Sequence, residues 1–272
     1  MSDRLASQSF LGPESGAILA AIEVGVVGLG GGGSHVVQQL AHLGVGNFVP
    51  VDDDIIEERN LNRLVGGTAD DVRADDVRAG ASKTAIAERV IRGVNPAARV
   101  TSCQMKWQEA AKTLRRCDVI FGCVDSYRER DELERFARRF LIPYIDIGMD
   151  VHGAPGKFSI SGQTVLSSPG GPCLWCLGIL TQDRIAEEAG RYGKAGSRPQ
   201  VVWANGVLAS LAVGLFVQLI CPWHGTAQLT ACCEFDGNHH RVETSRLDHA
   251  RDIRCNHFKA DELGDAFFCR PE

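Results

Sequence analysis

The stretch Val24-Gly-Val-Val-Gly-Leu-Gly-Gly-Gly-Gly-Ser34 decides the fold of this chain. It joins an apolar run to the spacing Gly28-x-Gly30-x-x-Gly33. In a strand-turn-helix unit, the first glycine permits a sharp turn, the second admits a phosphate close to the backbone, and the third lets the helix pack closely on the sheet. Free N–H groups at the helix start then face the phosphates. The stretch therefore predicts a nucleotide-binding loop.

An acidic residue completes this predicted site. A second apolar run, residues 48–51, is followed by Asp52. A carboxylate at that position accepts hydrogen bonds from ribose hydroxyls. Glycine runs also occur in ordinary loops, which is the alternative for the glycine motif taken alone. The order strand, loop, helix and acid favours nucleotide binding.

Composition and charge narrow the class of protein. The chain has 272 residues, of which 44% are hydrophobic, so it can bury a large core as one domain or two modest ones. Its 29 basic and 34 acidic side chains give a mildly acidic surface. Such a surface argues against a nucleic-acid binder and against a protein of anionic membranes.

The cysteines and the N-terminus indicate the compartment. The N-terminus does not have the pattern of a signal peptide, and the longest apolar run, residues 201–221, is interrupted by polar residues and glycines as in a buried helix. Ten cysteines without a secretory signal point to a reducing compartment, with metal or thiol chemistry in place of disulfides. We expect a cytoplasmic protein.

Strand and helix patterns alternate through the first half of the chain. Apolar strand patterns cover residues 24–27, 48–51, 100–103, 119–124 and 144–147. Helical patterns cover residues 34–43, 82–93, 110–116 and 127–140. This alternation predicts an α/β fold with a Rossmann-like, doubly wound, mostly parallel sheet.

The pattern changes after Lys157. Short strands are expected at residues 158–160, 164–166, 227–235 and 240–244, around a long helix at 201–220. They predict a mixed or antiparallel extension of the same sheet, and Asp236-Gly237 is a hairpin signal. Residues 181–199, rich in charge and glycine, are expected to form a long loop. The sequence Ala-Asp-Asp-Val-Arg occurs at 69–73 and again at 74–78, and this short insertion is expected to be a loop or a helix start.

Residues that a dehydrogenase would not need indicate that the bound nucleotide is a triphosphate. The cluster Glu57-Glu58-Arg59-Asn60-Leu61-Asn62-Arg63 follows the nucleotide acid. Phosphate transfer requires fixed cations and a metal, and Arg63 and Lys83 are the candidate cations. Asp125 ends a predicted strand at the edge where parallel sheets bind ligands, so it can hold Mg²⁺. The alternatives are an ordinary loop arginine, a solvated lysine at a helix start, and a helix N-cap at Asp125.

Taken in order, these motifs resemble the ubiquitin-activating superfamily in its bacterial ThiF/MoeB/HesA branch. The resemblance covers residues 4–258. It rests on the glycine loop, Asp52, Asn60-Leu-Asn-Arg63, Lys83 in a helix that ends at Asn95-Pro96, Val124-Asp125-Ser126 with Arg130, and Pro143-Tyr-Ile-Asp146. The chain would then be one adenylation domain, residues 1–272, with a nucleotide-binding half at about 20–150 and a carrier-binding and dimer half at about 151–272.

The resemblance implies an adenylyltransferase that uses ATP and Mg²⁺. Its substrate would be the C-terminal glycine carboxylate of a ubiquitin-like or sulfur-carrier protein. The implied nucleotide site comprises Gly28, Gly30, Gly31, Gly33, Asp52 at the ribose, Asp54, phosphate-binding Asn60, Arg63 and Lys83, and Asp125 at the magnesium ion. A terminal carboxyl, with a pKa of about 3.5, is already ionised near neutrality. The reaction therefore needs neither a serine nucleophile nor a histidine base.

The resemblance also implies partners. Relatives act as homodimers in which an N-terminal arginine reaches the other subunit's phosphates, and Arg4 is the candidate here. A conjugating enzyme is a possible further partner, and some bacterial relatives act in antiviral defence. The remaining alternatives are adenylation of a peptide or a tRNA base, an inactive carrier-binding subunit, and a nicotinamide-dependent dehydrogenase.

A pair of cysteines predicts a structural zinc site. Cys173-Leu-Trp-Cys176 has the spacing that lets two thiolates bind one zinc ion. In the resembled family a second pair lies near the C-terminus, where this chain reads Arg254-Cys255-Asn-His257-Phe258. The ligands would be Cys173, Cys176, Cys255 and His257, or would include Cys221 and His224. Two buried cysteines in an apolar turn are the alternative.

The thiol that forms a thioester in some relatives has no counterpart at its usual place. Residues 177–220 contain no cysteine. Cys221, Cys232, Cys233 or Cys269 could substitute only if the fold brings one of them close. Two smaller departures are Leu64 in place of a glutamine and a longer stretch between Arg63 and Lys83.

Overall fold

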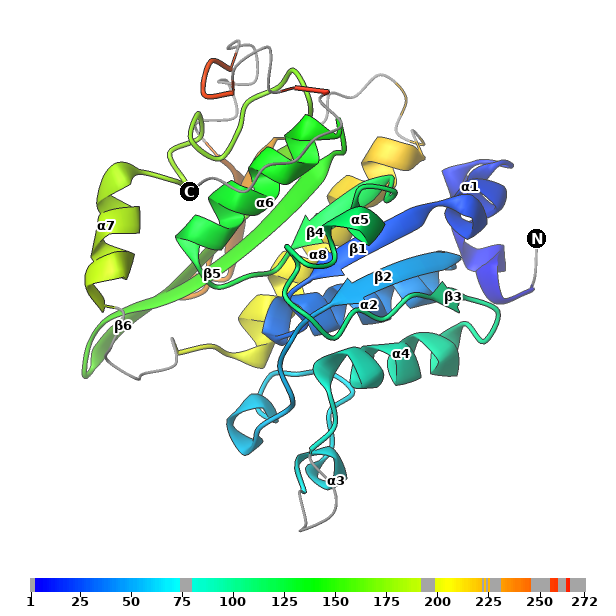
Figure 1. Cartoon of the computed structure of the whole chain (residues 1–272), viewed down its shortest axis with the longest axis horizontal. Helices are drawn as coiled ribbons and strands as arrows, with labels where there is room; N and C mark the ends of the chain where they lie inside the picture. The colour runs from blue at the N-terminus through cyan, green and yellow to red at the C-terminus, as the bar shows by residue number, and fades with distance from the viewer. Residues whose placement is uncertain are drawn as a thin grey trace.

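One mixed sheet forms the centre of the protein. The structure, a computed structural model, describes residues 3–73, 80–191, 199–221, 223, 225, 231–245, 255–258 and 263–264. Within them, eight strands lie in the order β3-β2-β1-β4-β5-β6-β7-β8 (Figure 1). They are β1 (Glu23–Val27), β2 (Asn47–Val51), β3 (Arg99–Val100), β4 (Val119–Gly122), β5 (Tyr144–Ala154), β6 (Lys157–Ser167), β7 (Cys232–Asp236) and β8 (Arg241–Thr244). Neighbours from β3 to β5 pair in parallel and those from β5 to β8 pair antiparallel, which confirms the predicted fold class.

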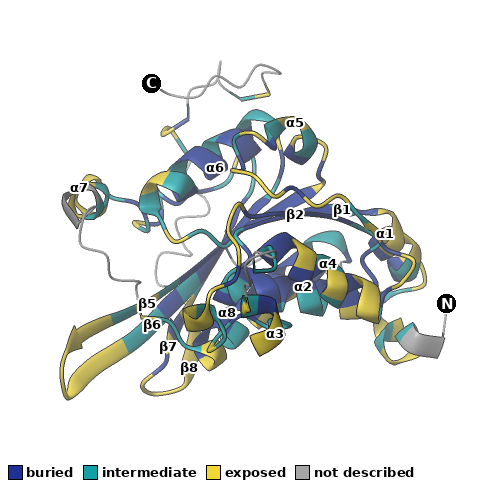
Figure 2. Ribbon diagram, turned by 60° about the horizontal axis from the view of Figure 1, so that its bottom comes forward, coloured by how far each residue is buried: buried dark blue, intermediate teal, exposed yellow. Residues whose placement is uncertain are grey.

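Helices cover both faces of the parallel part of the sheet. They are η1 (Asp3–Leu11), α1 (Ser15–Ala21), α2 (Gly31–Leu43), η2 (Glu58–Asn60), α3 (Ala69–Val72), α4 (Lys83–Val94), α5 (Ala111–Leu114), α6 (Tyr127–Arg139), α7 (Gln182–Arg191) and α8 (Val202–Ile220). Figure 2 shows α2, α4 and α8 on one face, with α5 and α6 on the other. The far ends of β5 and β6 extend beyond these layers and are exposed.

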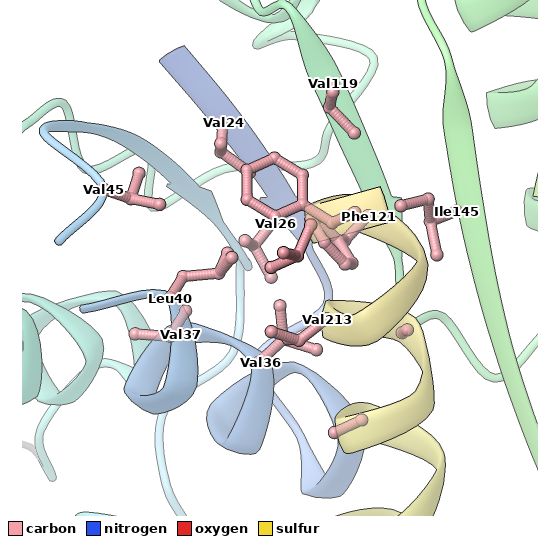
Figure 3. Close-up of a cluster of buried hydrophobic side chains, with 14 of the residues drawn as sticks. Val24, Val26, Val36, Val37, Leu40, Val45, Val119, Phe121, Ile145 and Val213 are labelled. Atoms are coloured by element: carbon pink, nitrogen blue, oxygen red, sulfur yellow. The ribbon is translucent and has the colours of Figure 1, made fainter. Parts of the chain in front are cut away.

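The main core lies between β1, β4 and the helices α2 and α8. Val26 of β1 and Phe121 of β4 are fully buried against Val36 and Leu40 of α2 (Figure 3). Burial of one such side chain stabilises the fold by about 1.5–3 kcal/mol. Because both faces of these strands are covered, their sequences are continuous apolar runs, which is why they were recognisable.

Helix α8 is long and apolar enough to cross a membrane by length and composition alone. Half of its most apolar window is buried in the described structure. It packs on α2 and on strands β5 and β6. The arrangement agrees with the buried helix expected for this segment.

Two strand predictions differ from the structure. The strand expected at 100–103 is β3, residues 99–100, and Cys103 makes only an isolated bridge to Val51. The two strands expected at 158–160 and 164–166 are one strand, β6. Gly162 lies between them and does not interrupt the strand. The residue is a glycine because a Cβ there would lie 2.4 Å from Leu208 of α8. The glycine lets α8 cross the sheet closely.

The predicted loop at 181–199 is wrong for its first half, which forms helix α7. The Thr181 hydroxyl accepts a hydrogen bond from the N–H of Arg184 at the start of this helix. Helix α7 packs beside α6. Tertiary contact with α6 thus outweighs the glycine and charge content that indicated a loop.

Two further segments bear on the predictions. The helices η1 and α1 precede the first predicted strand and were not expected. The first copy of the five-residue repeat begins α3, which Thr68 caps, so the helix-start interpretation is confirmed there. The second copy, residues 74–78, lies outside the described residues. Strand β7 ends at Asp236, and residues 237–240 connect it to β8 in the hairpin that the Asp236-Gly237 signal predicted.

Candidate nucleotide and metal sites

A cavity of about 700 Å³ opens at the carboxyl ends of β1 and β4. These strands are neighbours in the sheet, but the chain goes from β1 outward to β2 and β3 before it returns to form β4. Ligands of doubly wound proteins bind at such a reversal. The cavity therefore lies where the sheet topology favours a ligand site.

The three motif glycines have three different environments. Gly28 has φ +85°, and a Cβ at this position would lie 2.6 Å from the carbonyl oxygen of Cys123. A Cβ on Gly33 would lie 1.9 Å from the carbonyl oxygen of Gly28, so the first turn of α2 needs glycine to pack on β1. A Cβ on Gly30 would meet nothing within 4 Å. Gly30 borders the cavity, and this open space is the room that a phosphate requires.

Gly31 is a glycine because of a contact with α8. A Cβ on Gly31 would lie 2.4 Å from Nδ2 of Asn205 and 3.1 Å from Oε1 of Gln200. Helix α2 begins at Gly31 without a side-chain cap at Gly30. The N–H groups of its first turn are therefore available to a ligand.

Asp52 and Lys83 form a buried ion pair beside the glycine loop. Oδ2 of Asp52 accepts a 2.6 Å hydrogen bond from the N–H of Leu29, and Oδ1 accepts one of 2.9 Å from the N–H of Asp54. Nζ of Lys83 lies 2.6 Å from Oδ2 of Asp54 and 3.5 Å from Oδ1 of Asp52. Both Asp52 and Lys83 are only 9% exposed, so Lys83 is not the solvated lysine of the alternative interpretation.

The electrostatics of this pair keep Lys83 charged. Burial lowers the pKa of the Lys83 ammonium, but the carboxylates of Asp52 and Asp54 outweigh it, and the net shift is upward. Burial raises the pKa of Asp52 against the opposing effect of Lys83 and the two N–H donors. A cation is thus fixed at the wall of the cavity, which Asp52, Asp54 and Lys83 all line.

Asn60 and Arg63 also line the cavity. Oδ1 of Asn60 accepts a 2.9 Å hydrogen bond from the N–H of Glu57, which closes the turn η2. Nη1 of Arg63 donates to the carbonyl oxygen of Arg59 at 2.7 Å and to Oδ1 of Asn62 at 2.9 Å. These contacts hold the guanidinium group at the cavity, which both Asn60 and Arg63 line.

Asp125 follows β4 and is an exposed residue of the cavity lining. Its Oδ1 accepts a 3.1 Å hydrogen bond from Nε2 of Gln200. The N-cap of α6 is Ser126, whose hydroxyl accepts a hydrogen bond from the N–H of Glu129, so the N-cap interpretation of Asp125 is wrong. Asp125 lines the cavity, so its carboxylate is among the oxygen donors that could hold a metal there.

The charges of the cavity suit a metal bound together with an anionic nucleotide. The described lining residues include seven carboxylates and five cationic side chains, namely Asp52, Asp53, Asp54, Asp125, Glu129, Glu132 and Glu188, and Arg63, Lys83, Lys106, Arg128 and Arg130. The pKa of Glu129 is raised, first by burial and then by neighbouring carboxylates, including Glu132 and Asp125. Oxygen donors at this density are the ligands that Mg²⁺ prefers, so the residues present fit that ion.

The cavity residues that the sequence analysis missed include three polar residues from the second half of the chain. Gln200, which precedes α8, and Asn205 in its first turn both reach the glycine loop. Glu188 of α7 accepts hydrogen bonds at Oε2 from the Ser126 hydroxyl and the Tyr127 N–H, both at 2.9 Å. No local motif marks these three residues, because they come from the second half of the chain and reach the site only through folding.

A second cluster gathers four potential metal ligands, none of which lines the cavity. Sγ of Cys173 lies 3.6 Å from Sγ of Cys176, and Nδ1 of His257 lies 3.4 Å and 3.3 Å from these two sulfurs. Sγ of Cys255 is 3.9 Å from the same nitrogen. All four ligand atoms lie within 4.8 Å of one another. Ligands of a tetrahedral zinc ion are about 3.6–3.8 Å apart, given its usual bond lengths, so the cluster can hold a metal.

The neighbouring residue Phe258 packs the segment that carries His257 against α6. Phe258 is buried, and the guanidinium groups of Arg135 and Arg138 lie over its ring at 5.3 Å and 5.0 Å. Residues 255–258 are thereby anchored on α6, with His257 next to the cysteines. Cys221, from the alternative ligand set, is buried at the end of α8 and is not part of the cluster, whereas His224 lies outside the described residues.

Sequence and structure comparisons agree with this architecture. The pattern of the ThiF family matches residues 2–257. The chain belongs to the ThiF family. The SAMP-activating enzyme E1 of Haloferax volcanii is 36% identical over 169 residues, which are 61% of this chain and 57% of that protein. The sulfur carrier protein adenylyltransferase of Thermus thermophilus is 30% identical over 169 residues, 61% of this chain and 59% of that protein.

This ThiF-family chain also shares its fold with a solved structure. The crystal structure of E. coli MccB with ATP matches with a TM-score of 0.73 and 19% identity, over 94% of this chain and 74% of that chain. The chain spans less than two thirds of the length of the two curated relatives above. The family assignment made from the motifs is confirmed.

Among the described residues of this ThiF-family protein, the cysteines considered for a thioester do not line the cavity. Cys232 is buried in β7, and Cys233 of the same strand does not line the cavity. The side chain of Arg4 and all of Cys269 lie outside the described residues. A thiol that does line the cavity is Cys123, at the end of β4, and burial holds its pKa far above the usual range.

Helix α6 supports the cysteine pair through a buried carboxylate. Oε1 of Glu134 accepts hydrogen bonds from the Ser167 hydroxyl at 2.5 Å and from the N–H of Leu174 at 3.0 Å, and Nε of Arg138 lies 3.7 Å away. Glu134 and Arg138 are almost completely buried. The carboxylate thus fixes the segment that begins the Cys-x-x-Cys turn.

We expect Glu134→Ala to lower the free energy of unfolding by about 3–5 kcal/mol, because it leaves the buried charge of Arg138 uncompensated. Urea denaturation checks this value. Glu109→Ala, at an exposed residue outside these contacts, is the matched control. It should change the free energy of unfolding by less than about 0.5 kcal/mol. Equal stability of the two variants would show that the pair does not support the fold.

Proposed function

We propose that this protein is an adenylyltransferase that activates the C-terminal glycine carboxylate of a ubiquitin-like or sulfur-carrier protein with ATP. The observation that supports it best is the convergence of Arg63, Lys83 and Asp125 on the cavity beside the glycine loop. A dehydrogenase would use the loop and Asp52 but has no need of these three residues. Membership of the ThiF family supports the same proposal.

The proposed reaction is a nucleotidyl transfer. A carboxylate oxygen of the carrier attacks the α-phosphorus of ATP, and the bond from that phosphorus to the bridging oxygen of pyrophosphate breaks. The products are an acyl-adenylate and pyrophosphate. In this protein, Asn60, Arg63 and Lys83 would bind the phosphates and Asp125 would hold Mg²⁺, whose charge offsets the negative charge of the reacting groups.

The direct test is ATP–pyrophosphate exchange with candidate carriers, each with and without its terminal glycine. We expect exchange only with the intact tail. Exchange with a short peptide, and with no carrier protein, would identify the alternative substrate class. The absence of exchange under conditions where ATP binds would instead indicate an inactive carrier-binding subunit.

We also propose that the protein acts as a homodimer in which Arg4 reaches the phosphates of the other subunit. The proposal comes from the family resemblance. Light scattering of the purified chain tests the oligomeric state. Mixing Arg4→Ala with Asp125→Ala subunits tests the shared site, because one site of each mixed dimer would carry both intact residues and recover exchange.

We propose that the cysteine and histidine cluster binds structural zinc. Cys173→Ser should then release the metal and lower Tm by several degrees, since bound metal stabilises the folded state. Metal analysis and thermal melts of the two proteins provide the measurement. Cys233→Ser, at a partly buried cysteine outside the cluster, is the control that should keep the metal. A parent protein purified without zinc, and unchanged by added zinc, would contradict the proposal.

A further inference from the structure

Gln200 touches three parts of the cavity that are far apart in the sequence. Its Nε2 donates to Oδ1 of Asp125 at 3.1 Å. Its Oε1 lies beside the glycine loop, 3.1 Å from where a Cβ on Gly31 would be. Its backbone oxygen lies 3.5 Å from Nδ2 of Asn62 in the cluster that ends at Arg63. Gln200, which precedes α8, therefore joins the glycine loop, the cluster that ends at Arg63 and the end of β4.

The chemistry of the two side chains fixes the orientation of the amide. A carboxylate only accepts hydrogen bonds, so the nitrogen end of Gln200 must face Asp125. An amide N–H also leaves the negative charge of the carboxylate intact, whereas a lysine or arginine at position 200 would compete with a metal cation. A carboxylate offers about four acceptor positions, and the bond from Gln200 uses one of them, so this bond does not itself compete with a metal ion.

The hydrogen bond from Gln200 affects metal binding because it lowers the entropic cost of ordering the Asp125 side chain. Asp125 is an exposed residue, and an exposed side chain loses conformational entropy when a metal fixes it. A hydrogen bond to one of its oxygens restricts the carboxylate before the ion arrives. Groups that orient metal ligands in this way contribute strongly to metal affinity.

We propose that Gln200 is a positioning residue for the magnesium ligand: its amide presets the Asp125 carboxylate and so couples the start of α8 to the binding of Mg²⁺·ATP. This inference rests on the proposed function, in which Asp125 holds the ion. It assigns to a residue of the second half of the chain a role in the nucleotide site. Gly31 is part of the arrangement, since any side chain there would collide with the amides of Gln200 and Asn205.

The test compares nucleotide binding with and without the metal. Calorimetry of the full chain, without any carrier, gives the Kd for ATP in EDTA and the Kd for Mg²⁺·ATP, and their ratio measures the contribution of the ion. We expect Gln200→Ala and Gln200→Met to reduce this ratio by about tenfold, the lower end for loss of a group that orients a metal ligand, with the Kd in EDTA nearly unchanged. The methionine variant keeps the approximate length and volume of the side chain and removes the amide that donates to Asp125.

Gln182→Ala, at an exposed glutamine of α7 that does not line the cavity, is the matched control and should retain the parent ratio. A parent ratio in both Gln200 variants would overturn the inference, as would a loss in the alanine variant that methionine restores. A parent that binds Mg²⁺·ATP more tightly than ATP but exchanges no pyrophosphate with any carrier would refute the proposed function alone. The two failures are therefore distinguishable.

Discussion

Asp125→Ala abolishes magnesium-dependent ATP–pyrophosphate exchange, with an expected loss of at least about 10³-fold, or about 4 kcal/mol in the activation free energy. The reason is positional. Asp125 follows β4 at the edge where open parallel sheets bind ligands. It lines the cavity, where Gln200 donates a hydrogen bond to its carboxylate. Its removal would leave the metal without its carboxylate ligand while the phosphate-binding cations stay in place.

The fold should survive this substitution, because Asp125 is exposed and does not cap α6. The Tm of the variant is expected within a few degrees of the parent value. Asp150→Ala, at an exposed aspartate of β5 outside the cavity lining, is the control and should keep parental exchange. Full exchange by Asp125→Ala at limiting Mg²⁺ would rule out the metal role.

Arg63→Ala should reduce the exchange rate by about 10³-fold or more, the effect of removing an arginine that stabilises a phosphoryl-transfer transition state. The guanidinium group is held at the cavity by the carbonyl oxygen of Arg59 and by Asn62. Because the group is positioned before substrate binds, its loss should act mainly on the rate and less on ATP affinity. Exchange kinetics at saturating ATP, together with the Kd for ATP, separate the two effects.

The chain offers a close control for this experiment. Arg59 lies four residues earlier in the same cluster, but its side chain is 61% exposed, pairs with Glu57 and does not line the cavity. Arg59→Ala should therefore stay within about threefold of the parent rate, as expected for an exposed ion pair. If Arg63→Ala also stays within tenfold, the arginine does not contact the reacting phosphates.

The nucleotide half was predictable because its signals are local. Gly28, Gly30 and Gly33 are close in sequence and each has the environment that its place in the motif requires. Lys83 and Asp125 were placed from strand and helix order, since parallel strands bring their carboxyl ends to one edge. The boundaries were less accurate: α2 begins within the glycine run at Gly31, and β3 is shorter than expected.

The second half was harder to predict because its elements depend on contacts between distant segments. Helix α7 has the composition of a loop, and it is ordered where Glu188 bonds to the start of α6. The strand β6 contains Gly162, which serves the close approach of α8. In both cases packing against another element overrides the local preference.

The sequence by itself determined the doubly wound fold, the glycine loop and the set of phosphate-binding candidates, because periodicity and short motifs encode them within a few residues. Only the tertiary structure decided which ligands join Cys173 and Cys176, and it selected Cys255 and His257, some 80 residues away. It also brought Gln200 to Asp125. Such pairings depend on where chain segments meet after folding, and no pattern of neighbouring residues records that.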